Sequence, residues 1–368
     1  MRTLVIGGTG PTGPYIINGL LERGHDVTML NRGSRDLREI PPSVSRIKAD
    51  PHFAETLAPA LEGKQFDLVV ATYGRLRVVA EQLVGKTGRV VAVGGAPGYR
   101  GFAAPESRTP AGIPIPTGEN ADRVETIEEN KPGFLIRRTE DALMAHHEAG
   151  DFNATLFRYP VVYGPRQIRP RMWWVIDRIQ QGRKHMVLPD GGMAVQTRGY
   201  AENMAHAVLL GVDHPEASAG QFYNCGDDEQ LTLSGWVQTI AACMSSDLEI
   251  ISVPDSHASV ARELIPMAGP ALHMLLDTAK VRTELGYRDR VPAREAMQRT
   301  VAWVLENPPD HSDDDRAFLQ AQFKLEDEMA TVYREFCAKL ETLAPVTREF
   351  AHSYAHPTKP GERDHRGR

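Results

Sequence analysis

The feature that most constrains this chain is a glycine-rich turn close to its N-terminus. A short apolar run at residues 3–6 leads into the turn at residues 7–13, and apolar residues then recur at helical spacing. This order predicts a strand, a tight turn and a helix. Glycine suits such a turn because it lets an anion approach the backbone while the helix aims its free N–H groups at that anion. A turn without a ligand is the alternative, since glycine-rich turns join many strands to helices.

We expect the anion to be the pyrophosphate of a dinucleotide, held by Gly7, Thr9, Gly10, Pro11, Thr12 and Gly13. After the next predicted strand, 26–30, the sequence reads Asn31-Arg32-Gly33-Ser34-Arg35, at the position that normally contacts the adenosine ribose. An acid there would accept hydrogen bonds from both ribose hydroxyls, whereas Arg32 and Arg35 offer cations to a 2′-phosphate. Asn31, Arg32 and Arg35 are therefore expected to bind NADP(H), with NAD(H) as the alternative. An exposed turn with solvated arginines is the competing interpretation.

Further short apolar runs at 46–48, 67–71, 89–93, 155–157 and 221–224 alternate with segments of helical periodicity. Strands that alternate with helices predict an α/β fold, in this case a Rossmann-like, doubly wound parallel sheet.

Composition excludes several classes of protein. The chain carries 42 Lys+Arg against 48 Asp+Glu, a net charge of -6, which disfavours a nucleic-acid partner. No apolar run reaches the roughly 18 residues that a membrane span needs. The three cysteines and the scattered histidines form no metal-binding spacing. The first predicted strand begins at residue 3 and leaves no room for a signal peptide, so we expect a cytoplasmic protein without a membrane partner or a metal.

Later motifs follow the order found in one known family. They are Asp50 after the third predicted strand, Arg158-Tyr159-Pro160-Val161-Val162-Tyr163-Gly164-Pro165, Glu202-Asn203-Met204-Ala205-His206-Ala207, and Phe222-Tyr223-Asn224-Cys225-Gly226. With the glycine turn, they resemble the extended or atypical short-chain dehydrogenase/reductase superfamily, the NAD(P)-dependent epimerase/dehydratase family, from residue 1 to about residue 305. The resemblance implies an N-terminal cofactor domain and a smaller C-terminal substrate lobe. It also implies cofactor contacts from Asp50, Tyr73, Gly94, Tyr159, Pro160 and Val162.

The chain departs from the family where the chemistry is carried. Family members use a Tyr-x-x-x-Lys pair on the helix before the strand that contains Arg158, and the lysine lowers the tyrosine pKa for proton exchange. They also use a serine or threonine at the end of the strand that precedes this helix. Here the hydroxyl position reads Gly94-Gly95-Ala96, and no tyrosine is followed four residues later by lysine. If the helix is aligned on Phe134, Arg138 takes the lysine position, whereas alignment on Glu140 puts Ile136 there.

Other residues could take over the catalytic role. Arg138 could hold the cofactor ribose, although its high pKa makes it a poor proton shuttle. Tyr73, Tyr99 and Tyr163 each follow the end of a predicted strand, where ligands bind in such sheets. Tyr99 is the first choice for the proton donor. The alternative for each tyrosine is a structural ring whose hydroxyl is satisfied within the protein.

Substrate contacts are expected from a segment that follows the Gly164-Pro165 turn. Arg166, Arg169 and Trp173 lie there, and arginines beside aromatic rings could clamp a carboxylate, a phosphate or a flat ring. Trp173 could equally pack in the core, with the arginines solvated. Arg198 lies close to the position where nucleotide-sugar members hold a phosphate, but the spacing is offset and Gln196 is an alternative counterpart. The irregular, proline-rich stretch 96–132 is either a binding loop or a surface loop.

We expect an NAD(P)-binding domain at 1–165 with contributions from about 195–228, substrate-lobe segments at 166–305, a helical appendage at 306–355 and a disordered tail at 356–368. Ser312 followed by three aspartates predicts the start of the appended helix. An apolar stripe then recurs at helical spacing and could cover its own subunit, the more common case, or a second subunit of a homodimer. The stripe consists of Leu325, Met329, Val332, Phe336, Leu340 and Leu343.

Together these features predict an NADP(H)-dependent oxidoreductase of the carbonyl reductase or dehydrogenase type that acts on a small organic substrate without the Tyr-Lys pair. Two alternatives remain open: a cofactor-binding sensor or scaffold without turnover, and an NAD(P)-dependent epimerase or lyase.

Overall fold

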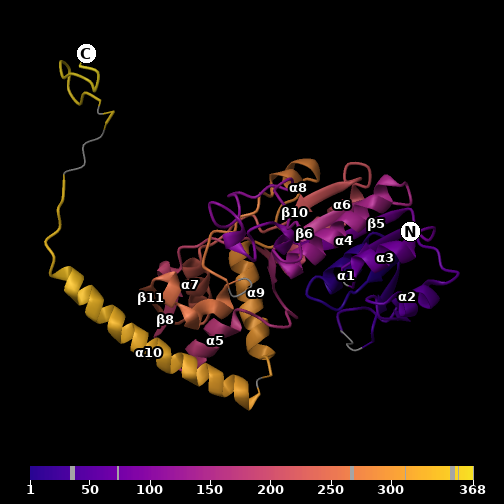
Figure 1. Ribbon diagram of the computed structural model, residues 1–368, viewed down its shortest axis with the longest axis horizontal. Helices are drawn as coiled ribbons and strands as arrows, with labels where there is room; N and C mark the ends of the chain where they lie inside the picture. The colour runs from indigo at the N-terminus through magenta and orange to yellow at the C-terminus, as the bar shows by residue number, and fades with distance from the viewer. Residues whose placement is uncertain are drawn as a thin grey trace.

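The computed structural model describes residues 1–33, 38–72, 74–265, 269–310, 312–348, 353–354 and 356–367. Within them, one parallel sheet forms the centre of the N-terminal half (Figure 1), with the strand order β10-β6-β5-β4-β1-β2-β3. Its strands are β1 (Arg2–Ile6), β2 (Asp26–Asn31), β3 (Ser45–Lys48), β4 (Leu68–Ala71), β5 (Arg89–Gly95), β6 (Asn153–Tyr159) and β10 (Gln221–Asn224). The predicted doubly wound parallel sheet is confirmed.

Helices cover both faces of this sheet because alternate strand residues are apolar on both sides. On one face, α1 (Gly13–Glu22) and α6 (Ala201–Asp213) pack over Val5, Val70 and Val91. On the other face, α2 (Ala54–Leu61), α3 (Leu76–Leu83) and α4 (Lys131–Glu148) pack over Leu4, Ile6 and Val90. Burial of both faces is what a parallel sheet requires.

A second, smaller body of structure follows β6 and has its own apolar core. Two parallel strand pairs belong to it: β7 (Val161–Tyr163) with β9 (Arg198–Tyr200), and β8 (His185–Pro189) with β11 (Glu249–Val253). Around them lie α5 (Trp173–Gln180), α7 (Leu233–Cys243) and α9 (Ala293–Glu306), whose apolar side chains share one cluster, whereas α8 (Ala279–Glu284) lies against β10. None of the helices in the described part of the chain is both long and apolar enough to cross a membrane.

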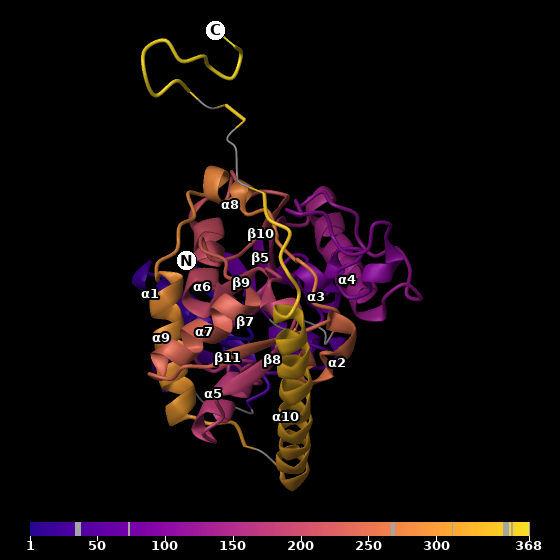
Figure 2. The ribbon, with the colours of Figure 1, turned by 90° about the vertical axis from the view of Figure 1, so that its left-hand side faces the viewer.

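The long helix α10 (Asp313–Glu341) lies along the outside of this second body (Figures 1 and 2). The predicted start is confirmed, because the Ser312 hydroxyl accepts a hydrogen bond from the Asp315 amide at 3.1 Å and the Asp315 carboxylate accepts one from the Ser312 amide at 3.0 Å. The expectation that the predicted stripe covers its own subunit is wrong for five of its six residues. Leu325, Val332, Phe336, Leu340 and Leu343 are exposed and only Met329 is half-buried.

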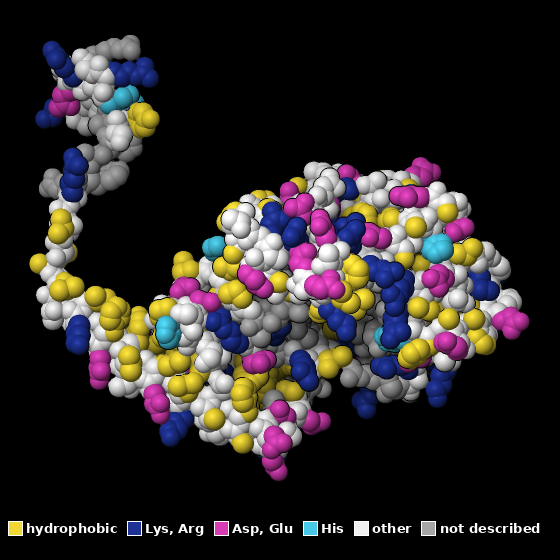
Figure 3. All heavy atoms as spheres, viewed as in Figure 1, with side chains coloured by type: hydrophobic (Ala, Val, Ile, Leu, Met, Phe, Trp, Pro, Cys, Tyr) yellow, Lys and Arg dark blue, Asp and Glu magenta, His cyan; other side chains and the backbone are white. Residues whose placement is uncertain are grey.

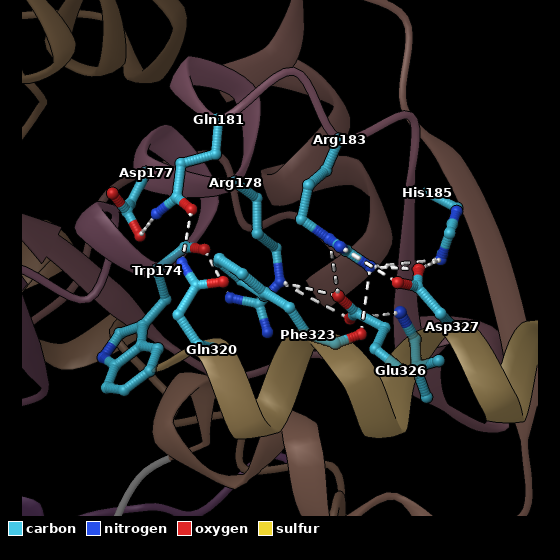
Figure 4. Close-up of polar contacts among 11 residues, drawn as sticks. Trp174, Asp177, Arg178, Gln181, Arg183, His185, Gln320, Phe323, Glu326 and Asp327 are labelled. Carbon is cyan, nitrogen blue, oxygen red and sulfur yellow. Dashed lines mark hydrogen bonds and ion pairs between the residues drawn. The ribbon is translucent and has the colours of Figure 1, made fainter. Parts of the chain in front are cut away.

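A neighbouring face of α10 packs on the body instead, through Leu319, Phe323, Glu326 and Ala330. Glu326 is fully buried and receives Arg178 Nε of α5 at 3.2 Å and the Val187 amide of β8 at 2.9 Å (Figure 4). The Phe323 ring lies beneath two guanidinium groups, 5.1 Å from that of Arg178 and 4.7 Å from that of Arg183. Periodicity missed this face because a glutamate, which reads as polar, occupies its centre.

The buried Arg178–Glu326 pair makes a strong prediction for stability. Glu326→Ala leaves Arg178 charged and unpaired in the interior, and we expect it to lower the free energy of unfolding by about 3–5 kcal/mol. The double change Arg178→Met with Glu326→Leu removes both charges and should recover most of that loss. Urea denaturation measures each variant. Arg316→Ala, which breaks an exposed pair on the same helix, is the matched control and should change the value by less than about 1 kcal/mol. An equally small loss in Glu326→Ala would contradict the assignment.

Candidate functional site

The glycine turn between β1 and α1 has the geometry of an anion cradle. Gly7 and Gly8 have φ angles of 110° and 85°, which favour glycine. A Cβ atom on Gly13 would lie 2.1 Å from the Gly8 carbonyl oxygen, whereas one on Gly10 would meet no atom within 4 Å. Thr12 is the N-cap of α1, and its side chain caps no N–H group. The Gly13 amide donates to the Gly10 carbonyl at 3.1 Å and Pro14 has no N–H group, so a ligand would approach the turn through the open space beside Gly10.

The cradle lies where a doubly wound sheet binds ligands. β1 and β4 are the neighbours from which the strand order runs outward in opposite directions, and ligands bind beside the carboxyl ends of strands at that point. Thr9, Pro11 and Thr12 fall within the turn itself. Tyr159, Pro160 and Val162 are half-buried at the carboxyl end of β6 and in β7, and the Tyr159 hydroxyl donates to the Met204 carbonyl at 3.1 Å.

The predicted ribose and adenine contacts lie at the ends of β2 and β3. The Asn31 side chain accepts a hydrogen bond from the Gly33 amide at 3.0 Å, and Arg32 is exposed. Hydrogen bonds from His52 hold the pKa of Asp50 below its usual range, and the charge of Arg32 acts in the same direction. Arg35 and Tyr73, the other two predicted cofactor contacts here, lie outside the described residues.

The space beside Gly10 allows a direct test of the cradle. Gly10→Ala adds a methyl group that meets nothing in the protein itself, so we expect unchanged thermal stability. The same methyl group would occupy the space of a bound pyrophosphate, so binding of NADPH, followed by its fluorescence, should weaken at least tenfold. Gly88→Ala, another glycine with open space around it, is the control and should bind normally. Normal binding by Gly10→Ala would place the dinucleotide elsewhere.

Contacts of α4 with the sheet favour one of the two alignments. Glu140 is fully buried, and Ile136, one turn earlier, faces Gly98, where a Cβ would lie 3.1 Å from the Ile136 Cγ2 atom. Arg138 lies about 200° around the helix from Ile136, is exposed, and stacks on Phe134 of its own helix at 6.0 Å. These contacts favour the alignment on Glu140, which puts Ile136 at the lysine position and Pro132 at that of the tyrosine.

Gly94 lies at this same contact between β5 and α4, where a side chain has little room. A Cβ on Gly94 would lie 2.9 Å from Leu156 Cδ2 and 3.1 Å from Glu140 Oε1. Glu140 in turn receives Arg158 of β6, with 2.7 Å between Arg158 Nη2 and Glu140 Oε2. A hydroxyl side chain at position 94 has no room unless Glu140 and Leu156 move.

Tyr99 is a buried member of a hydrogen-bond network. It is 1% exposed, its hydroxyl donates to Asn224 Oδ1 at 2.7 Å, and it accepts from Arg158 Nη1 at 2.8 Å. Burial raises the pKa of Tyr99, and the positive charge of Arg158 opposes that rise. These contacts favour the structural alternative for this tyrosine over the role of proton donor.

Tyr163 is likewise tied into the protein. It is 4% exposed, and its hydroxyl donates to Asp227 Oδ2 at 2.9 Å. Asp227 also accepts the Tyr200 amide at 2.8 Å and the Asn203 side chain at 3.0 Å. Burial raises the pKa of Tyr163 well above its usual range, and the charge of Asp227 adds to this effect. A tyrosine held this way is a poor source of protons at neutral pH.

The predicted substrate residues separate into three places. Arg166 turns toward the N-terminal half, where its Nη1 lies 2.8 Å from Glu39 Oε1 and its guanidinium lies 5.1 Å from the Tyr15 ring. Arg169 and Trp173 line a cavity of about 510 Å³ whose other wall includes Phe318 of α10. Arg198 is the third and lies inside, at the start of β9.

Arg198 is a buried cation without a carboxylate partner among the described residues. It is 6% exposed, lies 4.7 Å from the Trp236 ring, and makes one long polar contact of 3.5 Å, to Gln196 Oε1. Burial lowers the pKa of Arg198 to about 10, and the charge of Arg171 acts in the same direction. Two more buried donors nearby, Gln196 Nε2 and Trp236 Nε1, have no acceptor within the described structure. Sequence reasoning had no signal for Trp236.

Gln196 connects this cation to the sheet. It lies at a small cavity of about 10 Å³ together with Ala96, which directly follows β5, and with Pro160 and Val161, which connect β6 to β7. The remaining walls are mostly apolar: Phe102, Thr197, Met274 and Leu276. The backbone of Thr117, in the stretch 96–132, exchanges hydrogen bonds with Leu275 and Asp277 at 2.8 Å, so this stretch lies over the cavity. Nowhere in the described part of the chain do three potential metal ligands cluster.

The comparisons with known proteins fit this arrangement. Residues 137–226 match the model of the NAD dependent epimerase/dehydratase family. A dTDP-glucose 4,6-dehydratase of Actinoplanes is 27% identical over 195 residues, which cover 52% of this chain and 57% of the dehydratase. The chain thus spans about half the length of the curated relatives that it matches first.

Two further likenesses extend over more of the chain. A 3-diazoavenalumate denitrifying reductase of Streptomyces is 24% identical over 258 residues, which cover 67% of this chain and 82% of the reductase. A crystal structure of dTDP-glucose 4,6-dehydratase from Bacillus anthracis in complex with NAD superimposes with a TM-score of 0.65 at 15% identity. It covers 84% of this chain and 97% of the dehydratase. At that identity the superposition shows the fold, which is the Rossmann-like α/β fold of these enzymes.

Proposed function

We propose that this chain is an NADP(H)-dependent oxidoreductase that transfers hydride to or from a small organic substrate bearing an anionic group. The unpartnered Arg198 is the observation that carries the proposal. Burying a cation without a counter-charge is costly, so proteins rarely keep one unless a ligand supplies the anion. Arg198, Gln196 and Trp236 together offer donors to one carboxylate or phosphate.

The bound nicotinamide would supply the hydride, and this chain's residues would bind and orient both molecules. The backbone N–H groups of Gly10 and Thr12 would hold the pyrophosphate, and the ends of β5 and β6 would face the ring. Gln196, which lies among the residues around the small cavity beside Ala96, would hold the substrate between the sheet and Arg198. Helix α4 carries no Tyr-x-x-x-Lys pair to move the proton, so in this proposal water supplies it.

The preference for NADP(H) rests on Arg32. An exposed arginine at the end of β2 would pair with a 2′-phosphate. Arg32→Ala should weaken NADPH at least tenfold and leave NADH unchanged, as measured by calorimetric titration of both cofactors. Lys64→Ala, which removes an exposed cation beside the amino end of β4, should alter neither affinity. Equal losses for NADPH and NADH, or tighter binding of NADH by the unaltered protein, would refute the preference.

A second candidate is a cofactor-binding sensor without turnover. The observation that favours it is α4, which presents Pro132 and Ile136 where the family's tyrosine and lysine stand, while Tyr99 and Tyr163 are hydrogen-bonded inside the protein. An epimerase or lyase is distinguished by turnover without net consumption of NADPH.

Oxidation of NADPH with matched carbonyl compounds, one set bearing a carboxylate or phosphate and one set neutral, tests the proposal. We expect turnover with anionic members and at least a tenfold preference for them in kcat/KM. Arg198→Met should abolish that preference. It should also leave the ligand-free protein at least as stable, because an uncompensated buried charge is removed. Tight NADPH binding without turnover on any member would favour the sensor, and a marked loss of stability in Arg198→Met would make Arg198 a structural residue.

A further inference from the structure

The outer face of α10 carries a continuous apolar ridge that the body of the protein leaves uncovered. Val332 is 65% exposed, Phe336 56%, Leu340 47% and Leu325 38%, and Leu343, two residues past the end of α10, continues the ridge at 65% exposure. The yellow side chains in Figure 3 gather along the C-terminal half of this helix. An exposed apolar patch of this extent marks a surface for association.

The ridge is a different face of α10 from the one that packs on the body, so the ridge stays exposed although the helix is docked. Its last buried residue is Ala330, and the Arg178–Glu326 pair fixes the rotation of the helix about its axis. Beyond Arg334, which pairs with Glu249 of β11 at 2.5 Å, the helix runs past the body (Figures 1 and 2). A helical end with no packing beneath it is marginal in water, so the ridge needs a partner.

The spacing of the ridge selects that partner. Leu325, Val332, Phe336 and Leu343 are separated by seven, four and seven residues, so the pattern reads the same in both directions about position 334. We propose that α10 pairs antiparallel with α10 of a second copy of this chain. Leu325 then packs against Leu343 of the second copy, and Val332 packs against Phe336. A two-fold interface requires this self-complementarity, because a residue that contacts a given position of the second copy must itself be contacted by that position of the second copy.

Charges beside the ridge agree with the antiparallel arrangement. Glu328 lies six residues before position 334 and Lys339 lies five residues after it, and both are exposed. Antiparallel pairing therefore brings Glu328 next to Lys339 of the second copy, twice by symmetry. Parallel pairing would set Glu328 against Glu328 instead, which is unfavourable.

Sedimentation velocity over a roughly hundredfold range of protein concentration tests the association. We expect a reversible dimer in the unaltered full chain and a monomer in Phe336→Glu, with thermal stability and NADPH binding kept. Ala338→Glu adds the same charge to the same part of the helix but on its polar side, and should dimerise normally. A monomer at every concentration, or a dimer unaffected by Phe336→Glu, would overturn the proposal.

Charge-swap variants test the orientation without disturbing the apolar contacts, and cysteine cross-linking tests it a second way. Glu328→Lys alone and Lys339→Glu alone should each weaken the dimer at least tenfold, and the double swap should restore it. On mild oxidation, Leu325→Cys combined with Leu343→Cys should form a cross-linked dimer, whereas Leu325→Cys alone should not. Cross-linking by Leu325→Cys alone would indicate parallel helices and would overturn the antiparallel assignment.

Discussion

The ion pair between Arg158 and Glu140 is the interaction on which the candidate site depends. Arg158 ends β6 and Glu140 lies on α4, so the pair fixes the helix against the sheet, with both side chains almost fully buried. Arg158 also donates to the Glu119 carbonyl at 2.8 Å and to Tyr99, which anchors the long stretch over the carboxyl ends of the strands. The Arg158 guanidinium therefore fixes α4 against the sheet, holds the stretch 96–132 over the cavity and positions Tyr99.

This arrangement has a direct consequence for the chemistry. With α4 aligned on Glu140, the positions of the family's tyrosine and lysine would fall on Pro132 and Ile136, and a hydroxyl side chain at Gly94 would meet Glu140 and Leu156. What the chain keeps is an open glycine cradle and a buried cation at Arg198. Hydride transfer needs orientation above all, whereas proton transfer is the part that a substrate or water can supply. The site is therefore suited to binding and orientation, and the identity of the acid lies outside α4.

Much of the fold follows from local patterns, whereas side-chain partners do not. The strands of the central sheet, the glycine turn and the Ser312 cap could be predicted because each depends on neighbours within a few residues, whereas β7, β8, β9 and β11 were not predicted. The α4 register could not, since Phe134 and Glu140 both fit the local spacing and only contacts with Gly94 and Gly98 favour one of them. Sequence periodicity missed the face of α10 that packs on the body because Glu326 counts as polar. Glu326 can be buried there only because its charge is paired with Arg178, 148 residues earlier in the chain. Arg198 was suggested by the resemblance to nucleotide-sugar members of the family, but its lack of a carboxylate partner among the described residues is a property of the folded protein alone.

A crystal structure of the chain with NADP+ bound is the most direct test of this assignment. We expect the pyrophosphate within hydrogen-bond distance of the backbone N–H groups of Gly10 and Thr12, the 2′-phosphate beside Arg32, and the nicotinamide at the ends of β5 and β6. Helix α4 has no tyrosine to approach the nicotinamide. The space between the nicotinamide C4 atom and Arg198 should accommodate a small anionic substrate. A cofactor bound away from the glycine turn, or a nicotinamide that leaves no path to Arg198, would contradict it.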